Sequence, residues 1–157
     1  MSEYRVTVDW TGNASPADFL KGRYSREHRW AFDGGIVVAA SSSPSVVRTP
    51  WSNPSNVDPE EAFVASISSC HMLTFLYLAA KAGFVVASYR DDAIGVMTRT
   101  TGGVEWVSRV TLMPRIDYAG DQPTADQLAE LHHAAHHDCF IANSVKTEIV
   151  VAPPAAG

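Results

Sequence analysis

Hydrophobic and polar residues alternate along much of the chain outside its centre, as they do in strands that bury one face. The first alternating segment spans residues 4–10, and a short helical turn is expected at residues 16–20. Residues 28–32 and 36–40 alternate on either side of an Asp-Gly-Gly sequence, which is a strong signal for a hairpin. The stretch at residues 41–57, rich in Ser and Pro, is expected to be a loop.

The centre of the chain, residues 58–84, has a different pattern. Residues 62–80 include no Asp, Glu, Lys or Arg, and apolar side chains occur on every face of the expected helix. Asp58 can cap this helix, with Pro59 at its first position and Glu61 three residues after the cap. A helix that is apolar nearly all round is expected to be buried, with other elements covering it on several sides.

The second half of the chain returns to short elements. We predict strands at residues 85–89, 93–100 and 104–114, a second helix at 125–138, a closing strand at 144–151 and a tail at 153–157. This order of strands broken by two helices predicts an α+β fold, with antiparallel sheets packed around the long central helix and the second helix. A chain of 157 residues without a linker is expected to form a single domain over residues 1–157.

Composition and charge narrow the classes of function. A formal net charge of −5, with no Lys/Arg cluster, argues against nucleic-acid binding. The first ten residues contain neither a basic nor an apolar segment, so we expect no signal peptide and a cytoplasmic location. The central helix is long enough to span a bilayer, but Ser66, Cys70, His71 and Thr74 would be costly in lipid, so we expect no membrane association.

The chain has two cysteines, Cys70 within the apolar helix and Cys139 just after the second helix. A free cysteine is often an inert core residue. Cys70, however, lies among Ser68, Ser69 and His71, and a nucleophilic cysteine needs donors or cations that stabilise its thiolate. In a reducing compartment, cysteines are more often free or redox-active than structural. The sequence therefore raises the question of whether these two sulfurs meet.

A group of histidines on the second helix suggests a different function. His132, His133, His136 and His137 form two pairs spaced four residues apart, which can present two imidazoles to a metal ion. No metalloprotease glutamate and no CxxC motif accompanies them, and a solvated polar helix face has the same pattern. The alternative function is therefore a non-catalytic small-molecule or metal-binding module that uses this helix.

Two segments resemble the OsmC/Ohr family of osmotically induced and organic-hydroperoxide-resistance proteins. Residues 58–65, Asp-Pro-Glu-Glu-Ala-Phe-Val-Ala, lead to Ser69-Cys70 and resemble the family's N-P-E-[EQ]-L-x-A-A stretch. Residues 139–146, Cys-Phe-Ile-Ala-Asn-Ser-Val-Lys, resemble its C-P-x-S-x-x-L-K segment. The order and size of the elements agree over essentially the whole chain. Phe140 replaces the usual proline and His71 the usual aromatic residue, which is typical of an OsmC-like side branch.

The resemblance implies a thiol-dependent peroxidase that reduces organic hydroperoxides, and we predict no cofactor. Cys70 matches the cysteine that attacks the peroxide, Cys139 the resolving cysteine and Glu60 the family's acid. The family's arginine matches Arg26 best, with Arg48 as the other candidate. An external dithiol, for which the resemblance implies dihydrolipoyl groups, would reduce the resulting disulfide.

The resemblance also implies an intertwined homodimer with its sites at the subunit interface. Helix geometry favours the same arrangement, because Glu60 and Cys70 would lie about 15 Å apart along one straight helix. One arginine cannot easily bridge an acid and a thiol at that distance. Antiparallel packing of two such helices would bring the acid of one chain to the thiol of the other, and a kink near residues 66–69 is the other possible arrangement.

Overall fold

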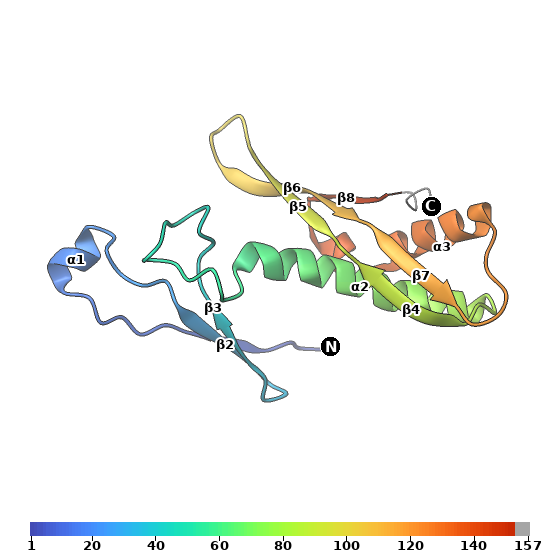
Figure 1. Cartoon of the computed structure of the whole chain (residues 1–157), viewed down its shortest axis with the longest axis horizontal. Coiled ribbons are helices and arrows are strands. Elements are labelled where there is room, and N and C mark those ends of the chain that lie inside the picture. Colours follow the sequence, from blue (N-terminus) through green and yellow to red (C-terminus); the bar gives the residue numbers. More distant parts are fainter. Residues whose placement is uncertain (153–157) are drawn as a thin grey trace. The chain divides into compact units, whose positions relative to one another are not determined.

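The computed structural model describes residues 1–152, which form two compact units. The N-terminal unit is Met1–Ala62, and the C-terminal unit begins at Phe63. The long helix α2 (Pro59–Lys81) starts in the first unit and continues through the second (Figure 1). The tail expected at residues 153–157 lies outside the described residues, and the single domain over residues 1–157 stays a prediction.

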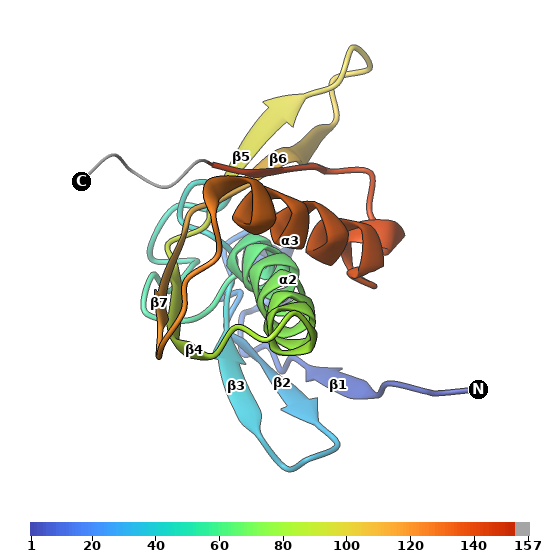
Figure 2. The ribbon, with the colours of Figure 1, turned by 90° about the vertical axis from the view of Figure 1, so that its right-hand side faces the viewer.

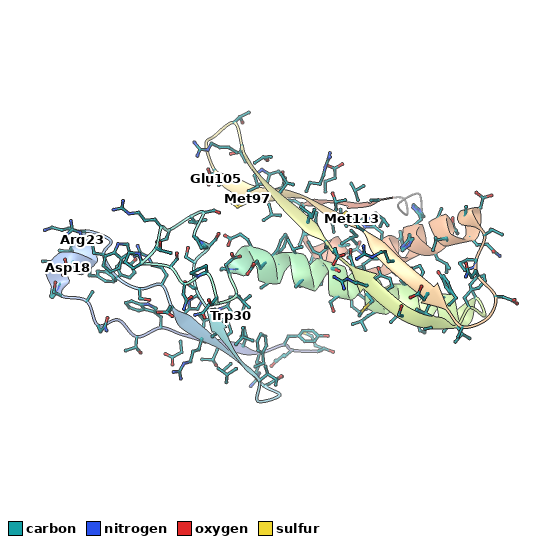
Figure 3. The ribbon with its side chains drawn as sticks, viewed as in Figure 1. Asp18, Arg23, Trp30, Met97, Glu105 and Met113 are labelled. Atoms are coloured by element: carbon teal, nitrogen blue, oxygen red, sulfur yellow. The ribbon has the colours of Figure 1, made fainter. Side chains whose placement is uncertain are left out.

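The N-terminal unit contains one antiparallel sheet. Its strand order is β1 (Val6–Asp9), β2 (His28–Phe32), β3 (Val37–Ala40), and the short helix α1 (Pro16–Leu20) lies between β1 and β2 in sequence. Trp30, labelled on β2 in Figure 3, pairs with Val8 on one side and Val38 on the other. The predicted hairpin and helical turn are both confirmed.

Very little apolar surface is buried in the N-terminal unit. Of its apolar residues, Ala40 alone belongs to the buried core, and the other buried residues there are polar: Ser41, Ser52 and Asp58. Val8, in contrast, is 63% exposed. A unit of this size needs a larger core to be stable alone, so its apolar surface is suited to contact with another surface.

The C-terminal unit contains two sheets and a second helix. The strands β4 (Val86–Asp91) and β7 (Pro114–Tyr118) form one sheet, and β5 (Ile94–Arg99), β6 (Glu105–Leu112) and β8 (Glu148–Val151) form the other. Figure 3 labels Met97 and Glu105 on the β5–β6 hairpin. The predicted α+β fold with antiparallel sheets and a long helix is confirmed. One pair departs from the prediction, because β8 runs parallel to β6. The helix α3 (Ala125–Asp138) lies in the connection between them and returns the chain in the same direction.

The prediction of one strand ending at residue 114 was wrong, because β6 ends at Leu112 and β7 begins at Pro114. The chain leaves one sheet after β6 and enters the other as β7, and the junction is Met113, labelled in Figure 3. The Met113 N–H donates to the Asp91 carboxylate at 2.7 Å, and Pro114 has no N–H to donate. Strand pairing is therefore interrupted here. The closing strand is also shorter than predicted, because a 3-10 turn occupies Ala142–Ser144.

The helix α2 buries one stripe of side chains within the chain. Ile67, His71, Phe75 and Ala79 are its buried residues, and their spacing of four places them on one face. Its opposite side stays open, with Leu73 60% and Tyr77 62% exposed. By length and composition alone α2 could also cross a membrane, a property that core helices of soluble proteins share.

Two apolar clusters hold α2 in the C-terminal unit. Phe75 and Ala79 pack against Leu131 and Ala135 of α3, which lies beside α2 (Figure 2). Nearer the start of the helix, Ile67 packs with residues of β6, namely Val110 and Leu112. The helix α3 begins with a complete capping box, in which Thr124 and Gln127 each satisfy the other's backbone N–H. The two clusters fix the helix faces that carry the cysteines.

Candidate functional site: a buried thiol pair between two helices

The structure brings the two cysteines together. Cys70 lies in the middle of α2, and Cys139 caps the C-terminal end of α3. Both are free thiols, and their sulfur atoms are 2.6 Å apart. A disulfide needs a separation of about 2.05 Å, so very little movement separates this pair from a covalent bond.

The two thiols have different surroundings. The side chain of Cys139 is 1% exposed, and its sulfur accepts the Ala142 N–H at 3.4 Å and donates to Cys70. Burial, followed by the hydrogen bond to Cys70, raises the pKa of Cys139 to about 11. Cys139 is therefore a thiol at neutral pH. Cys70 is partly exposed and lines an open cavity, so it is the sulfur that a substrate can reach.

The cavity beside Cys70 has a volume of about 950 Å³. Most of its wall is apolar, and its lining residues are Ser66, Ser69, Cys70, Leu73, Thr74, Tyr77, Asp138, Phe140 and Asn143. Phe140, which follows Cys139 directly, is 81% exposed. Apolar side chains that surround a reactive atom suit an organic molecule better than a small polar one.

The predicted arginine and acid lie in another cavity, which belongs to the N-terminal unit. Arg26 and Glu60 line this cavity of about 460 Å³, together with Trp10, Phe19 and Tyr24. The Arg26 guanidinium donates to the carbonyls of Gly22 at 2.7 Å and Tyr24 at 2.5 Å. Its carbon also lies 3.7 Å from the centroid of the Tyr24 ring.

These contacts, rather than a carboxylate, hold the arginine in place. Within residues 1–152, no ion pair joins Arg26 to Glu60. Arg48, the other candidate, is exposed in the loop before α2 and does not line the cavity. The N-terminal unit therefore places Glu60 and Arg26 along the same cavity, and the catalytic role of Arg26 stays a prediction.

Sequence analysis missed the aromatic residues that surround Arg26. Phe19 and Tyr24 stack with ring centroids 4.5 Å apart, and Trp10 packs edge-on against Tyr24. The sequence did contain a signal for them, because aromatic side chains recur in a connecting segment that is otherwise polar. Their packing makes the guanidinium part of an ordered wall.

The four histidines of α3 do not share one environment. His132 points inward, whereas His133, His136 and His137 are exposed. Within residues 1–152, no group of three or more His, Cys, Asp or Glu residues is placed to hold a metal ion. The spacing of four residues therefore reflects one buried histidine and a solvated polar face.

The inward histidine forms a buried pair with His71, which sequence analysis also missed. His71 Nε2 and His132 Nδ1 are 3.0 Å apart, so one ring donates a hydrogen bond to the other. The two rings are nearly parallel, and His132 also stacks on Phe75. His71 is 1% exposed, and its Nδ1 has no partner. The sequence signal was a polar residue within the buried stripe of α2.

Burial disfavours the charged form of both histidines. Burial, followed by the charges of His132 and His136, lowers the pKa of His71 to about 4. Burial also lowers the pKa of His132, while the Asp91 carboxylate acts in the opposite direction. Asp91 itself accepts hydrogen bonds from Ser68 at 2.5 Å and from the Met113 N–H at 2.7 Å.

This pair predicts that the fold loses stability in acid. The unfolded chain binds a proton at His71 with a pKa near 6.5, whereas the folded chain does so only near 4. Stability should therefore fall as the pH drops from 6.5 to 4, by about 1–3 kcal/mol for this residue. Urea unfolding at pH 7 and pH 4.5 measures the effect. An unchanged pH dependence in His71→Phe would contradict this origin.

Comparisons with known proteins agree with this architecture. The sequence profile of the OsmC-like protein family matches residues 52 to 153. Among curated proteins, no sequence matches the chain. An OsmC-like protein of unknown function from Vibrio cholerae is 50% identical, covers 97% of this chain and 99% of its own, and superposes with a TM-score of 0.91.

Organic hydroperoxide resistance proteins share the fold at lower identity. The protein from Elizabethkingia anophelis is 18% identical with a TM-score of 0.66, covering 96% of this chain and 94% of its own. The Legionella pneumophila protein is 13% identical with a TM-score of 0.66, covering 96% of each chain. The fold of this protein is therefore the one that OsmC and Ohr proteins share. This chain belongs to the OsmC-like protein family.

Proposed function

We propose that the protein is a thiol-dependent peroxidase that reduces organic hydroperoxides and is recycled by an external dithiol. The observation that carries this proposal is the pair of free thiols 2.6 Å apart, one open to a cavity and the other buried. The family supports it, because some of its members are organic hydroperoxide resistance proteins.

In the proposed first step, the Cys70 thiolate attacks the distal oxygen of R–OOH. The O–O bond breaks, the S–O bond forms and the leaving alkoxide takes up a proton as the alcohol. Cys70 becomes a sulfenic acid, so sulfur is oxidised by two electrons and the peroxide is reduced. The exposed position of Cys70 in the cavity and the buried position of Cys139 favour Cys70 as the attacking residue.

In the proposed second step, the Cys139 thiol condenses with the sulfenic acid. A disulfide forms and one water molecule leaves. This step needs no further oxidant, because the peroxide has already taken two electrons from sulfur. An external dithiol then attacks the disulfide and returns both cysteines to thiols through a mixed disulfide. We propose a dihydrolipoyl-type dithiol for this step, from the family resemblance.

We also propose that the working unit is a homodimer, in which one chain supplies Arg26 and Glu60 to the Cys70 of its partner. Two observations support it. The arginine and the acid line a cavity of the N-terminal unit, whereas Cys70 lines a cavity of the C-terminal unit. Apolar side chains are also exposed in both units, among them Val8 and Leu73. A positive charge near the thiolate would stabilise it and the charge that develops on the peroxide.

The direct test is reduction of cumene or t-butyl hydroperoxide by the purified protein with dihydrolipoamide. We expect turnover in the wild type and its loss in Cys70→Ser, because no other exposed sulfur lies in that cavity. Ser69→Ala is the matched control, since Ser69 lines the same cavity next to Cys70. Equal peroxide consumption by wild type and Cys70→Ser would contradict the proposed function.

The metal-binding alternative has a simple test. Metal analysis of protein purified without a histidine tag is expected to show less than one zinc, nickel or copper ion per chain. Stoichiometric metal, removed in His133→Gln or His137→Gln, would instead favour a binding module on α3.

A further inference from the structure

We propose that the His71–His132 hydrogen bond positions α3 against α2 for the resolving step, so that Cys139 can reach the sulfenic acid on Cys70. This inference rests on the proposed peroxidase function and assigns residues that act on its second step. His71 follows Cys70 on α2, and His132 lies on the same helix as Cys139, so the pair joins the two elements that carry the sulfurs.

Packing alone does not explain a histidine at this position. His71 occupies the buried stripe of α2 between Ile67 and Phe75, where an apolar side chain would fill the same space. Its Nδ1 is buried without a partner, which costs stability relative to a satisfied or apolar group. A buried polar pair that costs stability is instead well suited to fix one relative arrangement of two helices.

The position of the pair suits this role. Cys70 and His71 are adjacent on α2, but their partners on α3, Cys139 and His132, are seven residues apart, which is about two helical turns. Two contacts at this separation determine both the position of the end of α3 and its rotation about the helix axis. Cys139 follows the last residue of α3 as its C-cap, so a small rotation of that end would move its sulfur away from Cys70.

Stacking holds the rings in the plane that the hydrogen bond needs. The His132 ring lies between two others, with its centroid 4.6 Å from Phe75 and 5.3 Å from His71. A phenylalanine at position 132 would keep this stacking and remove the hydrogen bond. An asparagine there would place an amide near the position of Nδ1 and could restore the bond. These two substitutions therefore separate the bond from the packing.

The bond should also be sensitive to acid, because a proton on both rings leaves no acceptor. The titratable groups that act on the pair are His136 on α3 and Asp91 on β4, and Tyr89 on β4 packs against Phe75, on which His132 stacks. Asp91 favours a proton on His132, whereas burial and His136 disfavour one on His71. Because His71 gains a proton only near pH 4, an acceptor remains in the pair at higher pH, and the bond should break as the pH approaches 4.

The test follows the two steps separately after one equivalent of t-butyl hydroperoxide is mixed with reduced protein. Peroxide consumption reports the attack by Cys70, and loss of the second free thiol reports the disulfide. In His132→Phe we expect the first rate to stay within about twofold and the second to fall about ten- to a hundredfold. His132→Asn should recover much of the second rate. The control His133→Phe, at an exposed position of α3, should match the wild type in both.

A pH profile and a second oxidant complete the test. Loss of the Cys139 thiolate should slow disulfide formation in every variant as the pH falls, because the pKa of Cys139 is about 11. Between pH 6 and pH 4 the wild type should slow more steeply than His132→Phe, so the difference between their rates should shrink. Diamide forms the same disulfide without a peroxide. One thiolate adds to its N=N bond, the second thiol then attacks that sulfur, and diamide leaves as the reduced hydrazine. If the wild type shows no peroxidase activity but the diamide reaction slows in His132→Phe, the proposed function fails and the positioning role stands.

Three results would overturn the proposal. One is a folded His132→Phe that forms the disulfide at the wild-type rate with both oxidants. Another is an equal slowing of both steps, which would indicate general damage to the fold. If circular dichroism shows that His132→Phe is unfolded, the wild-type profile decides, and a decrease between pH 7 and pH 4.5 no steeper than loss of the Cys139 thiolate requires would then refute the role.

Discussion

The Cys139→Ser variant is expected to reduce about one equivalent of hydroperoxide per chain and then stop. The variant keeps Cys70 and its cavity, so the first attack should proceed at close to the wild-type rate. The sulfenic acid that forms has no thiol within reach, because Cys139 is the one other cysteine in the chain. Excess peroxide should then carry Cys70 on to the sulfinic acid, which the dithiol cannot reverse.

Intact mass spectrometry and thiol counting measure this outcome. Peroxide-treated wild type should lose both thiols and two mass units, whereas Cys139→Ser should gain one and then two oxygen atoms at Cys70. The expected loss of multiple-turnover activity is about a hundredfold or more. Continued turnover in Cys139→Ser with dihydrolipoamide would show that an external thiol resolves Cys70 directly. Over-oxidation of the wild type without a disulfide would exclude the resolving role.

Much of the fold was predictable because local signals agreed with the tertiary structure. Asp58 and Glu61 exchange the hydrogen bonds expected of a capping box, and Gly83, just after α2, has a φ of +87°. The hairpin around Asp33-Gly34-Gly35 also follows from turn chemistry. These features depend on neighbours in the sequence, which are visible before folding.

The errors arose where distant contacts decide the structure. The change of sheet at Met113 depends on the carboxylate of Asp91, and nothing near residue 113 shows that partner. The parallel pairing of β8 with β6 depends on where α3 returns the chain. A strand pattern specifies which face is buried but not which strand will be its neighbour.

The proximity of the two cysteines followed from the sequence, but their surroundings did not, and the roles of the site residues stay predictions. The family resemblance marked both cysteines, and the structure places their sulfurs 2.6 Å apart. Arg26, and not Arg48, lines the cavity that Glu60 lines, and the choice between the two arginines stays a prediction. The His71–His132 pair could not be inferred, because its members are 61 residues apart and each resembles an ordinary histidine when read alone.

Two inactive variants should restore activity when they share one dimer. Cys70→Ser retains Arg26 but lacks the attacking thiol, and Arg26→Ala retains the thiol but lacks the cation that we propose the partner supplies. In a mixed dimer with shared sites, the Cys70 of one chain would meet the Arg26 of the other in one complete site. The second site would carry both defects, so a statistical mixture should recover about a quarter of the wild-type activity.

Co-expression with two different tags and sequential purification gives the mixed dimer itself, in which half of the wild-type activity is expected. The matched control pairs Cys70→Ser with Cys139→Ser. Because Cys70 and Cys139 contact each other within one chain, that mixed dimer should stay inactive. A monomer by light scattering, or a verified Cys70→Ser/Arg26→Ala dimer without activity, would refute the shared site. Activity in the control dimer would show that the sulfurs react between chains instead.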